Sequence, residues 1–301
     1  ITIRSTVNNE DPYKEVPNYK LYPEDDIINV TNLYTSYYNH VNKFDEQFLN
    51  YLEALDSSLY NIIDYKTGLN LKILTIMNNN YKKVSTSRFT EMSDDIAYLE
   101  TQYDVLAGKL PTEVGEIAIL VDRYNNIDVS VLDSLGIDYQ NKKTYTFSEM
   151  MQKEYRVILN DDAYLRNSNG TYINLFNYSS QLESLYNKSE LVLKISGIIR
   201  ISPRAVTNLY DNGILYSRKL TEYVVNNANE SMIVKEQKQY GLTKDVLTGQ
   251  PFEDYESIYS KTTKEYQYEV WLGELCAHPV INTIRIYTDT FRNRVVINDY
   301  L

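Results

Sequence analysis

Cysteine and histidine, the residues most used as metal ligands and nucleophiles, are scarce in this chain. It holds one cysteine, Cys276, and two histidines, His40 and His278. Cys276 and His278 could supply two ligands to a zinc ion, but no second pair at zinc spacing exists. Neither histidine has a spacing that indicates a nucleophile partner, and neither a Gly-x-Ser-x-Gly motif nor a phosphate-binding glycine loop occurs. We interpret Cys276 as a partly buried thiol beside a loop histidine, and predict no metal and no cofactor.

Adjacent aspartates are the remaining candidates for catalysis. They occur at Asp25–Asp26, Asp94–Asp95 and Asp161–Asp162. Two carboxylates can carry out glycoside hydrolysis when they are held roughly 5 to 9 Å apart, and the tyrosines of Tyr255–Tyr259 could stack on a sugar. Neighbouring acids in polar loops are usually just solvated, however, and thirty tyrosines in the chain make one such loop a weak signal. We therefore assign no catalytic residue.

Composition narrows the classes of function. The net charge of -11 argues against binding nucleic acid through its phosphates, which requires a basic face. One cysteine excludes an internal disulfide. A mean hydropathy of -0.44 is typical of a globular protein, and the apolar runs are far shorter than the roughly 18 to 20 residues that a membrane helix needs.

The first part of the chain predicts a strand, an irregular segment, a helix and a second strand. Residues 1–7 alternate and are β-branched, which favours a strand, whereas residues 8–41 are polar with three prolines. Apolar residues at three- and four-residue steps predict a helix over 44–62, begun by Asn42 and ended before Gly68. Alternation over 69–73 predicts a strand that packs on this helix.

The middle and end of the chain show further elements. Residues 116–122 predict a strand, followed by a turn and a helix over 129–135 that Gly136 stops. Residues 190–200 predict a long strand that Gly197 interrupts, as a bulge or a close backbone approach would.

After a turn at 211–213, a four-residue step over 220–228 predicts a helix, while residues 233–270 show no clear period. Residues 284–286 predict a strand. The last helix should present Phe291, Val295 and Val296 on one face, with Thr288 and Asp289 as candidate caps. Strands and helices alternate without a regular βαβ series, so we predict a mixed α+β fold.

Four stretches of the chain resemble one family in the expected order. They are 22–30 (YPEDDIINV) with 40–63 (HVNKFDEQFLNYLEALDSSLYNII), 102–137 (QYDVLAGKLPTEVGEIAILVDRYNNIDVSVLDSLGI), 190–203 (ELVLKISGIIRISP) and 281–301 (INTIRIYTDTFRNRVVINDYL). Together they resemble the large extracytoplasmic domain of ABC-transporter permeases of the MacB/FtsX type, in the Gram-positive branch. The segments 140–190 and 233–275, rich in tyrosine and asparagine, depart from the Gram-negative members of that family.

This resemblance implies two subdomains. A membrane-proximal, porter-like one would be built from both chain ends, residues 1–103 with 278–301, and an inserted α/β-rich one from residues 104–277. It also implies flanking transmembrane helices in the same chain, a separate cytoplasmic ATPase, a second permease copy and no catalytic residue in this domain. The outside partner would be a peptide, an antimicrobial, a lipid-linked molecule or a cell-wall protein, with specificity in 140–190 and 233–275.

Two other functions remain open at this stage. One is a free surface lipoprotein or adhesin that binds a peptide or a glycan, and the other is a secreted carbohydrate-active enzyme with two facing carboxylates. A strand that starts at Ile1 and a helix that runs to Leu301 lead us to expect a domain lying between two other segments. The transporter hypothesis further predicts that the two chain ends lie side by side and leave in the same direction.

Overall fold

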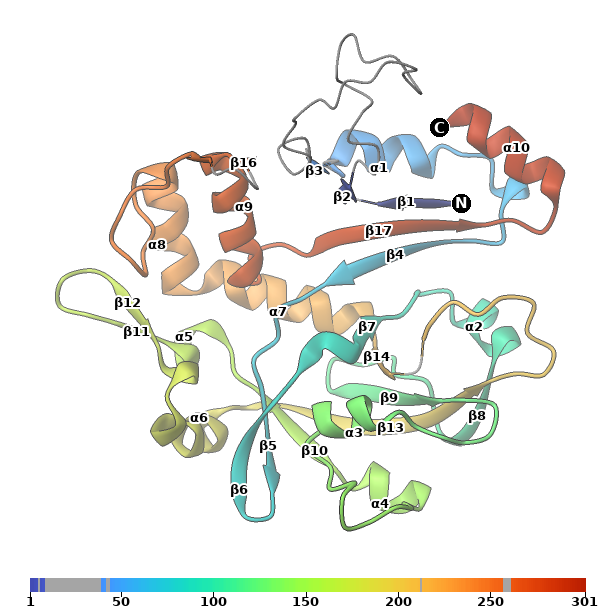
Figure 1. Ribbon diagram of the computed structural model, residues 1–301, viewed down its shortest axis with the longest axis horizontal. Helices are drawn as coiled ribbons and strands as arrows, with labels where there is room; N and C mark the ends of the chain where they lie inside the picture. Colours follow the sequence, from blue (N-terminus) through green and yellow to red (C-terminus); the bar gives the residue numbers. More distant parts are fainter. Residues whose placement is uncertain (5, 9–38, 42–43, 212, 257–260) are drawn as a thin grey trace, which may run out of the picture.

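A computed structural model describes residues 1–4, 6–8, 39–41, 44–211, 213–256 and 261–301. Two sheets, one of three strands and one of eight, lie on either side of helix α7 (Arg218–Glu230), and other helices cover their outer faces (Figure 1). The combination of helices with a mixed, twisted sheet confirms the α+β prediction.

The strands have the following bounds, in chain order: β1 Thr2–Arg4, β2 Thr6–Asn8, β3 Asn39–Val41, β4 Ile62–Gly68, β5 Ile73–Met77, β6 Asn80–Val84, β7 Phe89–Glu91, β8 Tyr103–Gly108, β9 Glu116–Val121, β10 Glu154–Val157, β11 Tyr164–Arg166, β12 Tyr172–Asn174, β13 Leu191–Ile201, β14 Gly213–Tyr216, β15 Tyr255–Glu256, β16 Lys261–Thr262 and β17 Val280–Tyr287. The α-helices besides α7 are α1 Glu46–Glu53, α2 Ile96–Gln102, α3 Val129–Ser134, α4 Phe147–Met151, α5 Asn160–Ala163, α6 Leu182–Lys188, α8 Met232–Tyr240, α9 Lys264–Glu274 and α10 Phe291–Tyr300.

The three-stranded sheet, which we call the small sheet, joins the two ends of the chain. Its order is β1-β17-β4, with antiparallel pairing that sets Ile3 opposite Ile284 and Asp64 opposite Arg285. Ile284 and Ile286 are fully buried under α1 and α10, where they pack with Leu52 and other apolar residues. Because side chains alternate along a strand, Arg285 between them points to the opposite face.

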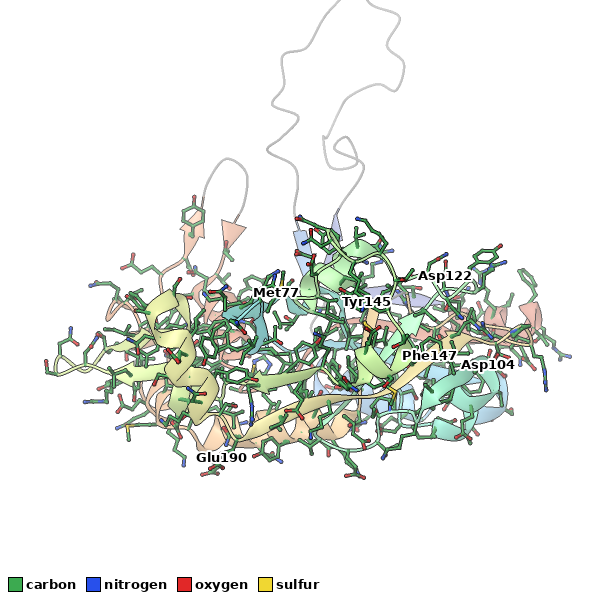
Figure 2. The ribbon with its side chains drawn as sticks, turned by 90° about the horizontal axis from the view of Figure 1, so that it is seen from below. Met77, Asp104, Asp122, Tyr145, Phe147 and Glu190 are labelled. Carbon is green, nitrogen blue, oxygen red and sulfur yellow. The ribbon has the colours of Figure 1, made fainter. Side chains whose placement is uncertain are left out.

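The eight-stranded sheet, the large sheet, is built around β13. Its order is β6-β5-β10-β13-β9-β14-β7, and β8 also pairs with β13. β13 pairs antiparallel with β10 and β8 and parallel with β9. Seen from below, β13 crosses the molecule from Glu190 toward the end where Asp104 and Asp122 lie (Figure 2). Arg200 of β13 reaches Asp104 at 3.9 Å and donates to Asn125 Oδ1 at 3.0 Å at that end.

Two glycines allow β13 and β8 to approach closely. Gly197 lies opposite Gly108, and the register of β13 against β9 shifts between Ile195 and Gly197. A Cβ atom on Gly197 would lie 2.1 Å from the Lys109 carbonyl oxygen, and one on Gly108, at φ +71°, would lie 2.0 Å from the Ser196 carbonyl oxygen. The predicted interruption at Gly197 is therefore confirmed, both as a bulge and as a close backbone approach.

Several other sequence-based elements are also confirmed. The predicted strand 116–122 and helix 129–135 correspond to β9 and α3, and α3 ends before Gly136, whose φ is +64°. The predicted strand 190–200 corresponds to β13. The four-residue step over 220–228 corresponds to α7, whose buried face includes Leu220, Val224 and Ala228.

The predicted helix over 44–62 was too long. α1 ends at Glu53, a 3-10 turn covers Ser57–Leu59, and Ile62 already belongs to β4, which Gly68 ends. The side chain of Asp45 caps α1 by accepting from Phe48 N, and the predicted cap, Asn42, lies outside the described residues. The apolar residues from Phe44 to Leu59 still pack in one cluster, whereas Ile62 packs in another, so the periodicity located a core face but not the end of the helix.

Three further parts of the chain differ from what the sequence patterns indicated. The strand predicted over 69–73 starts only at Ile73, and its apolar residues pack in the core of the large sheet rather than on α1. Residues 233–270, which showed no period, contain α8 and the first part of α9. The predicted last helix is present as α10, but Thr290 caps it instead of Thr288 or Asp289. Its buried residue is Ile297, while Phe291, Val295 and Val296 are exposed.

None of the helices in the described part of the chain combines the length and the apolar run that crossing a bilayer requires.

Candidate binding site

A cavity of about 460 Å³ lies between the small sheet, β7 and α7. Both layers contribute walls: β4 and α1 from one side, and α7 with the segment that follows β7 from the other. The described residues that line it include one guanidinium, Arg218, and six carboxylates: Glu53, Asp64, Glu91, Asp94, Asp95 and Glu222. We call this cavity the acidic cleft.

Asp64 is the most buried of these acids. Its side chain lies on β4 and is 4% exposed. The Tyr210 hydroxyl donates to Asp64 Oδ1 at 3.5 Å and accepts from Ser93 N at 2.8 Å. Burial raises the pKa of Asp64 to about 6, although Arg285 on the neighbouring strand acts in the opposite direction. This carboxyl group therefore takes up a proton more readily than an exposed aspartate does.

Glu91, at the end of β7, is the second buried acid. It belongs to the large sheet, whereas Asp64 belongs to the small sheet. Glu91 is 9% exposed and accepts a hydrogen bond from the Thr221 hydroxyl of α7. Burial raises the pKa of Glu91, and the hydroxyls of Thr221 and Thr67 partly offset that effect. The acidic cleft thus brings together one buried carboxylate from each of the two sheets.

Three acids at the rim of the acidic cleft, Asp94, Asp95 and Glu222, already have protein partners. Arg218 lies 3.6 Å from Asp94 and 3.5 Å from Glu222, so it is shared between two carboxylates. Asp95 accepts from Tyr98 N at 2.9 Å and caps α2. The predicted pair Asp94–Asp95 therefore lies at the cleft, but its two members have separate structural roles.

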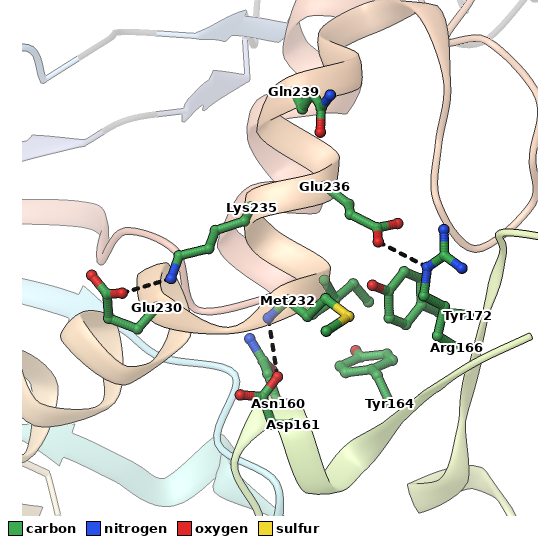
Figure 3. Close-up of a pocket in the computed structure, with 11 residues that line it drawn as sticks. Asn160, Asp161, Tyr164, Arg166, Tyr172, Glu230, Met232, Lys235, Glu236 and Gln239 are labelled. Atoms are coloured by element: carbon green, nitrogen blue, oxygen red, sulfur yellow. Dashed lines mark hydrogen bonds and ion pairs between the residues drawn. The ribbon is translucent and has the colours of Figure 1, made fainter.

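A second cavity, of about 490 Å³, lies between α5, the β11–β12 hairpin and α8 (Figure 3). Its residues come from both tyrosine- and asparagine-rich segments, 140–190 and 233–275, and from the end of α7. Four of its five charged lining residues form ion pairs within the protein: Arg166 Nε lies 2.8 Å from Glu236, and Lys235 Nζ lies 2.6 Å from Glu230. The fifth, Asp161, accepts a hydrogen bond from Met232 N. Internal pairing of this kind leaves little free charge for a ligand, so we favour the acidic cleft as the candidate site.

The predicted pair Asp161–Asp162 is also divided between two structural roles. Asp161 accepts from Met232 N at 3.0 Å at the start of α8, and Asp162 lies 2.6 Å from Lys188 Nζ. Asp25–Asp26 lies outside the described residues, as does most of Tyr255–Tyr259, of which Tyr255 is exposed.

Cys276 and His278 do not form a shared site. The buried Cys276 thiol donates to the Asn70 carbonyl at 3.4 Å, and burial raises the pKa of this thiol. The His278 ring lies 3.4 Å from Glu269. Within the described ranges, no three histidine, cysteine or acidic side chains are placed to hold a metal ion. His40 belongs to β3, and its side chain is outside the description.

Sequence reasoning missed both Asp64 and Glu91. A signal existed for Asp64, because a charged residue inside the apolar run Ile62–Tyr65 of a strand has to be either paired or functional. Glu91 gave no such signal, since its neighbours in sequence are mostly polar.

Comparison with known proteins identifies no family for this chain. No family model and no curated protein matches the chain. A solved structure, described as a domain of a "putative Permease protein" from Porphyromonas gingivalis, is similar over 82% of this chain and 84% of that chain, with 10% sequence identity and a TM-score of 0.27. A likeness at so low a TM-score carries no argument about fold or function.

Proposed function

We propose that this chain is a non-catalytic extracytoplasmic domain of an ABC-transporter permease of the MacB/FtsX type. Its role would be to couple ATP hydrolysis by a cytoplasmic ATPase to export, substrate handling or signalling at the outer face of the membrane. The proposal starts from the resemblance of four ordered stretches, and one structural observation supports it more than any other. Both ends of the chain belong to the same small sheet, in which β17 lies between β1 and β4.

The contact between the two ends is direct. The Ile1 amino group donates to Ile286 O at 2.8 Å, and Ile286 N donates back to Ile1 O at 2.8 Å. Ile1 and Tyr300 pack on the same buried cluster, and the two termini lie close together in Figure 1. The prediction that the ends lie side by side is confirmed, whereas the prediction that they leave in the same direction stays a prediction. This arrangement suits a module inserted between two segments that meet at one place.

The division into subdomains belongs to the same proposal. Residues 1–103 with 278–301 would form the porter-like, membrane-proximal part, and 104–277 the inserted part. The small sheet supports a part built from both ends. The boundary near residue 103 stays a proposal, and β5, β6 and β7, which precede it, are strands of the large sheet.

Labelling of intact cells tests the location. Val206 is 79% exposed, so a Val206→Cys variant of the complete gene product should react with a membrane-impermeant maleimide added to whole cells. The native Cys276 is 5% exposed and serves as the internal control, because it should label only after denaturation. If the Val206→Cys variant reacts only after the cells are lysed, the proposal is contradicted.

Co-purification tests the partners. The tagged complete protein, extracted from membranes with detergent, should bring down an ABC ATPase and a second permease copy. A surface-labelled protein that purifies without any ATPase, and whose gene encodes a lipoprotein signal, would instead support the surface lipoprotein or adhesin alternative.

A further inference from the structure

The described lining of the acidic cleft holds six carboxylates and one guanidinium, and Arg285 and Lys66 act on Asp64 from outside that lining. Arg218 serves Asp94 and Glu222, and Asp95 caps α2. The other three carboxylates, Glu53, Asp64 and Glu91, have no cationic group within 4 Å in the described part of the chain. Two of these three are buried, and a buried charge without a partner is costly in a folded protein.

Asp64 shows where a partner is missing. Its Oδ1 atom accepts one long hydrogen bond, at 3.5 Å from Tyr210, and its Oδ2 atom has no hydrogen-bond partner among the described residues. A carboxylate has lone pairs for about four hydrogen bonds, and buried polar groups are normally satisfied. Asp64 lines the acidic cleft with a side chain that is only 4% exposed. Asp64 can therefore accept a further hydrogen bond, and it borders both the acidic cleft and a smaller cavity lined in part by Lys66, Arg88 and Arg285.

The remaining wall of the acidic cleft is apolar. Leu49, Ile63, Met92, Val225, Pro279 and Ile281 line it beside the carboxylates. A bare metal ion gains nothing from such a wall, whereas a carbon chain gains roughly 0.8 kcal/mol for each buried CH₂ group. Lysine and arginine side chains, and simple alkylamines, combine an apolar stem with a charged end in this way.

We propose that the acidic cleft binds an organic cation, an ammonium or guanidinium group on an apolar stem, whose charged end lies between Asp64 and Glu91. The stem would lie against the apolar wall, and Glu53 at the rim would attract the cation on approach. The inference goes beyond the proposed function, since it holds whether or not the chain belongs to a transporter. The cation comes either from a basic side chain of a peptide or from a free amine.

Binding should weaken on acidification, because protons then compete with the ligand for the same carboxylates. Burial raises the pKa of Asp64 to about 6 and also raises that of Glu91. Arg285 and Lys66 act on Asp64, while Arg218 and Asp94 act on Glu91 in opposite senses. At about pH 5 Asp64 is largely protonated, and its attraction for a cation is largely lost.

Isothermal titration calorimetry of the 301-residue chain tests the proposal. The probes are an acetylated and amidated Leu-Lys-Leu tripeptide, its neutral analogue with norleucine in place of lysine, and n-hexylamine. At about pH 7.5 the lysine peptide should bind at least about tenfold more tightly than the norleucine peptide. Tighter binding of the lysine peptide than of hexylamine would identify a peptide as the source of the cation, and the reverse would identify a free amine.

Amide variants locate the binding. Asp64→Asn and Glu91→Gln keep the shape of the side chain and should each weaken the lysine peptide about tenfold. Asp133→Asn is the matched control, because Asp133 is exposed and lies outside the cleft, and it should leave the affinity unchanged. Wild-type protein at about pH 5 needs no substitution and should bind at least about fivefold more weakly than at about pH 7.5.

Three results would overturn the proposal. They are equal affinity for the lysine and norleucine peptides, unchanged binding in folded Asp64→Asn and Glu91→Gln variants, and unchanged binding at about pH 5. Displacement of the lysine peptide by an equal concentration of calcium chloride would also overturn it, in favour of an inorganic cation site.

Discussion

At the scale of single residues, Asp64 is a carboxylate that the fold buries. Because side chains alternate along a strand, its position in β4 fixes the buried face to which it points. It shares a face of β4 with Ile62, and that face packs against Tyr210. Arg285 lies opposite Asp64 in the strand register, yet its guanidinium donates to the Leu209 carbonyl at 3.2 Å instead. The result is a carboxylate that destabilises the folded chain when it is ionised.

The sign of the pH dependence follows from the raised pKa of Asp64. The folded chain holds the proton up to about pH 6, whereas the unfolded chain releases it near 3.8, so the free energy of unfolding falls as the pH rises through this window. Asp64→Asn removes the ionisation and should stabilise the protein by about 2 kcal/mol at about pH 7.5. The gain should vanish below about pH 4, where Asp64 is neutral in both states.

Urea unfolding of the two proteins across this pH range measures the difference. Asp133→Asn, an exposed acid paired with Lys82, should show no comparable pH-dependent gain. A gain for Asp64→Asn that grows toward acid pH would contradict the assignment of Asp64 as the buried charge.

At the scale of elements, the sequence patterns predicted those helices and strands that residues close in sequence stabilise. The strand–turn–helix of β9 and α3 was predicted from its apolar run, its turn and Gly136, and the structure adds a local cap, Asp128, at the start of α3. By contrast, α8 and α9 were missed because their support comes from residues distant in sequence. Gln237 of α8 is fully buried, and its Oε1 accepts from Trp271 Nε1 of α9 at 2.8 Å and from Val246 N at 3.1 Å. Its Nε2 donates to two carbonyls of the loop between these helices.

Replacing this amide should therefore loosen both helices. Gln237→Leu leaves the Trp271 indole N–H and the Val246 N–H without acceptors and should lower the free energy of unfolding by about 3 kcal/mol. Trp271 is the single tryptophan in the chain, so its fluorescence reports on this contact during urea unfolding. Gln239→Leu, two residues along on the exposed side of α8, is the control and should change the stability by less than about 0.5 kcal/mol. Equal effects of the two variants would argue against a structural role for the Gln237 amide.

At the scale of the whole molecule, the candidate site shows what sequence reading could not supply. Asp64 and Glu91 belong to different sheets, and they meet only because β4 packs against β7 and α7. The spacing of residues along the chain cannot predict that the two acids lie in one cleft, because this depends on how the small and large sheets pack. The joining of the chain ends, in contrast, was anticipated from the resemblance of four ordered stretches.

A circular permutant tests how closely the ends meet. A linker of about ten glycine and serine residues between Leu301 and Ile1, with new ends between Tyr124 and Asn125, should keep the fold because that turn is exposed. We expect an unchanged far-UV circular dichroism spectrum and a melting temperature within about 5 °C of the parent. A second permutant opened between Ser196 and Gly197, inside β13, should fail to fold. If the first permutant also fails to fold, the result would show that this linker cannot bridge the two ends.

The position of β17 also fixes the order in which this protein can be completed during its synthesis. Among the described strands of these 301 residues, β1 is synthesised first and β17 last, yet β17 is the middle strand of its sheet. Until Val280–Tyr287 has been made, β1 and β4 lack their partner in the small sheet as the described strands form it, while most of the large sheet can already assemble. A nascent chain that stops short of that segment therefore exposes two unpaired strands, which makes truncated copies a target for aggregation or degradation.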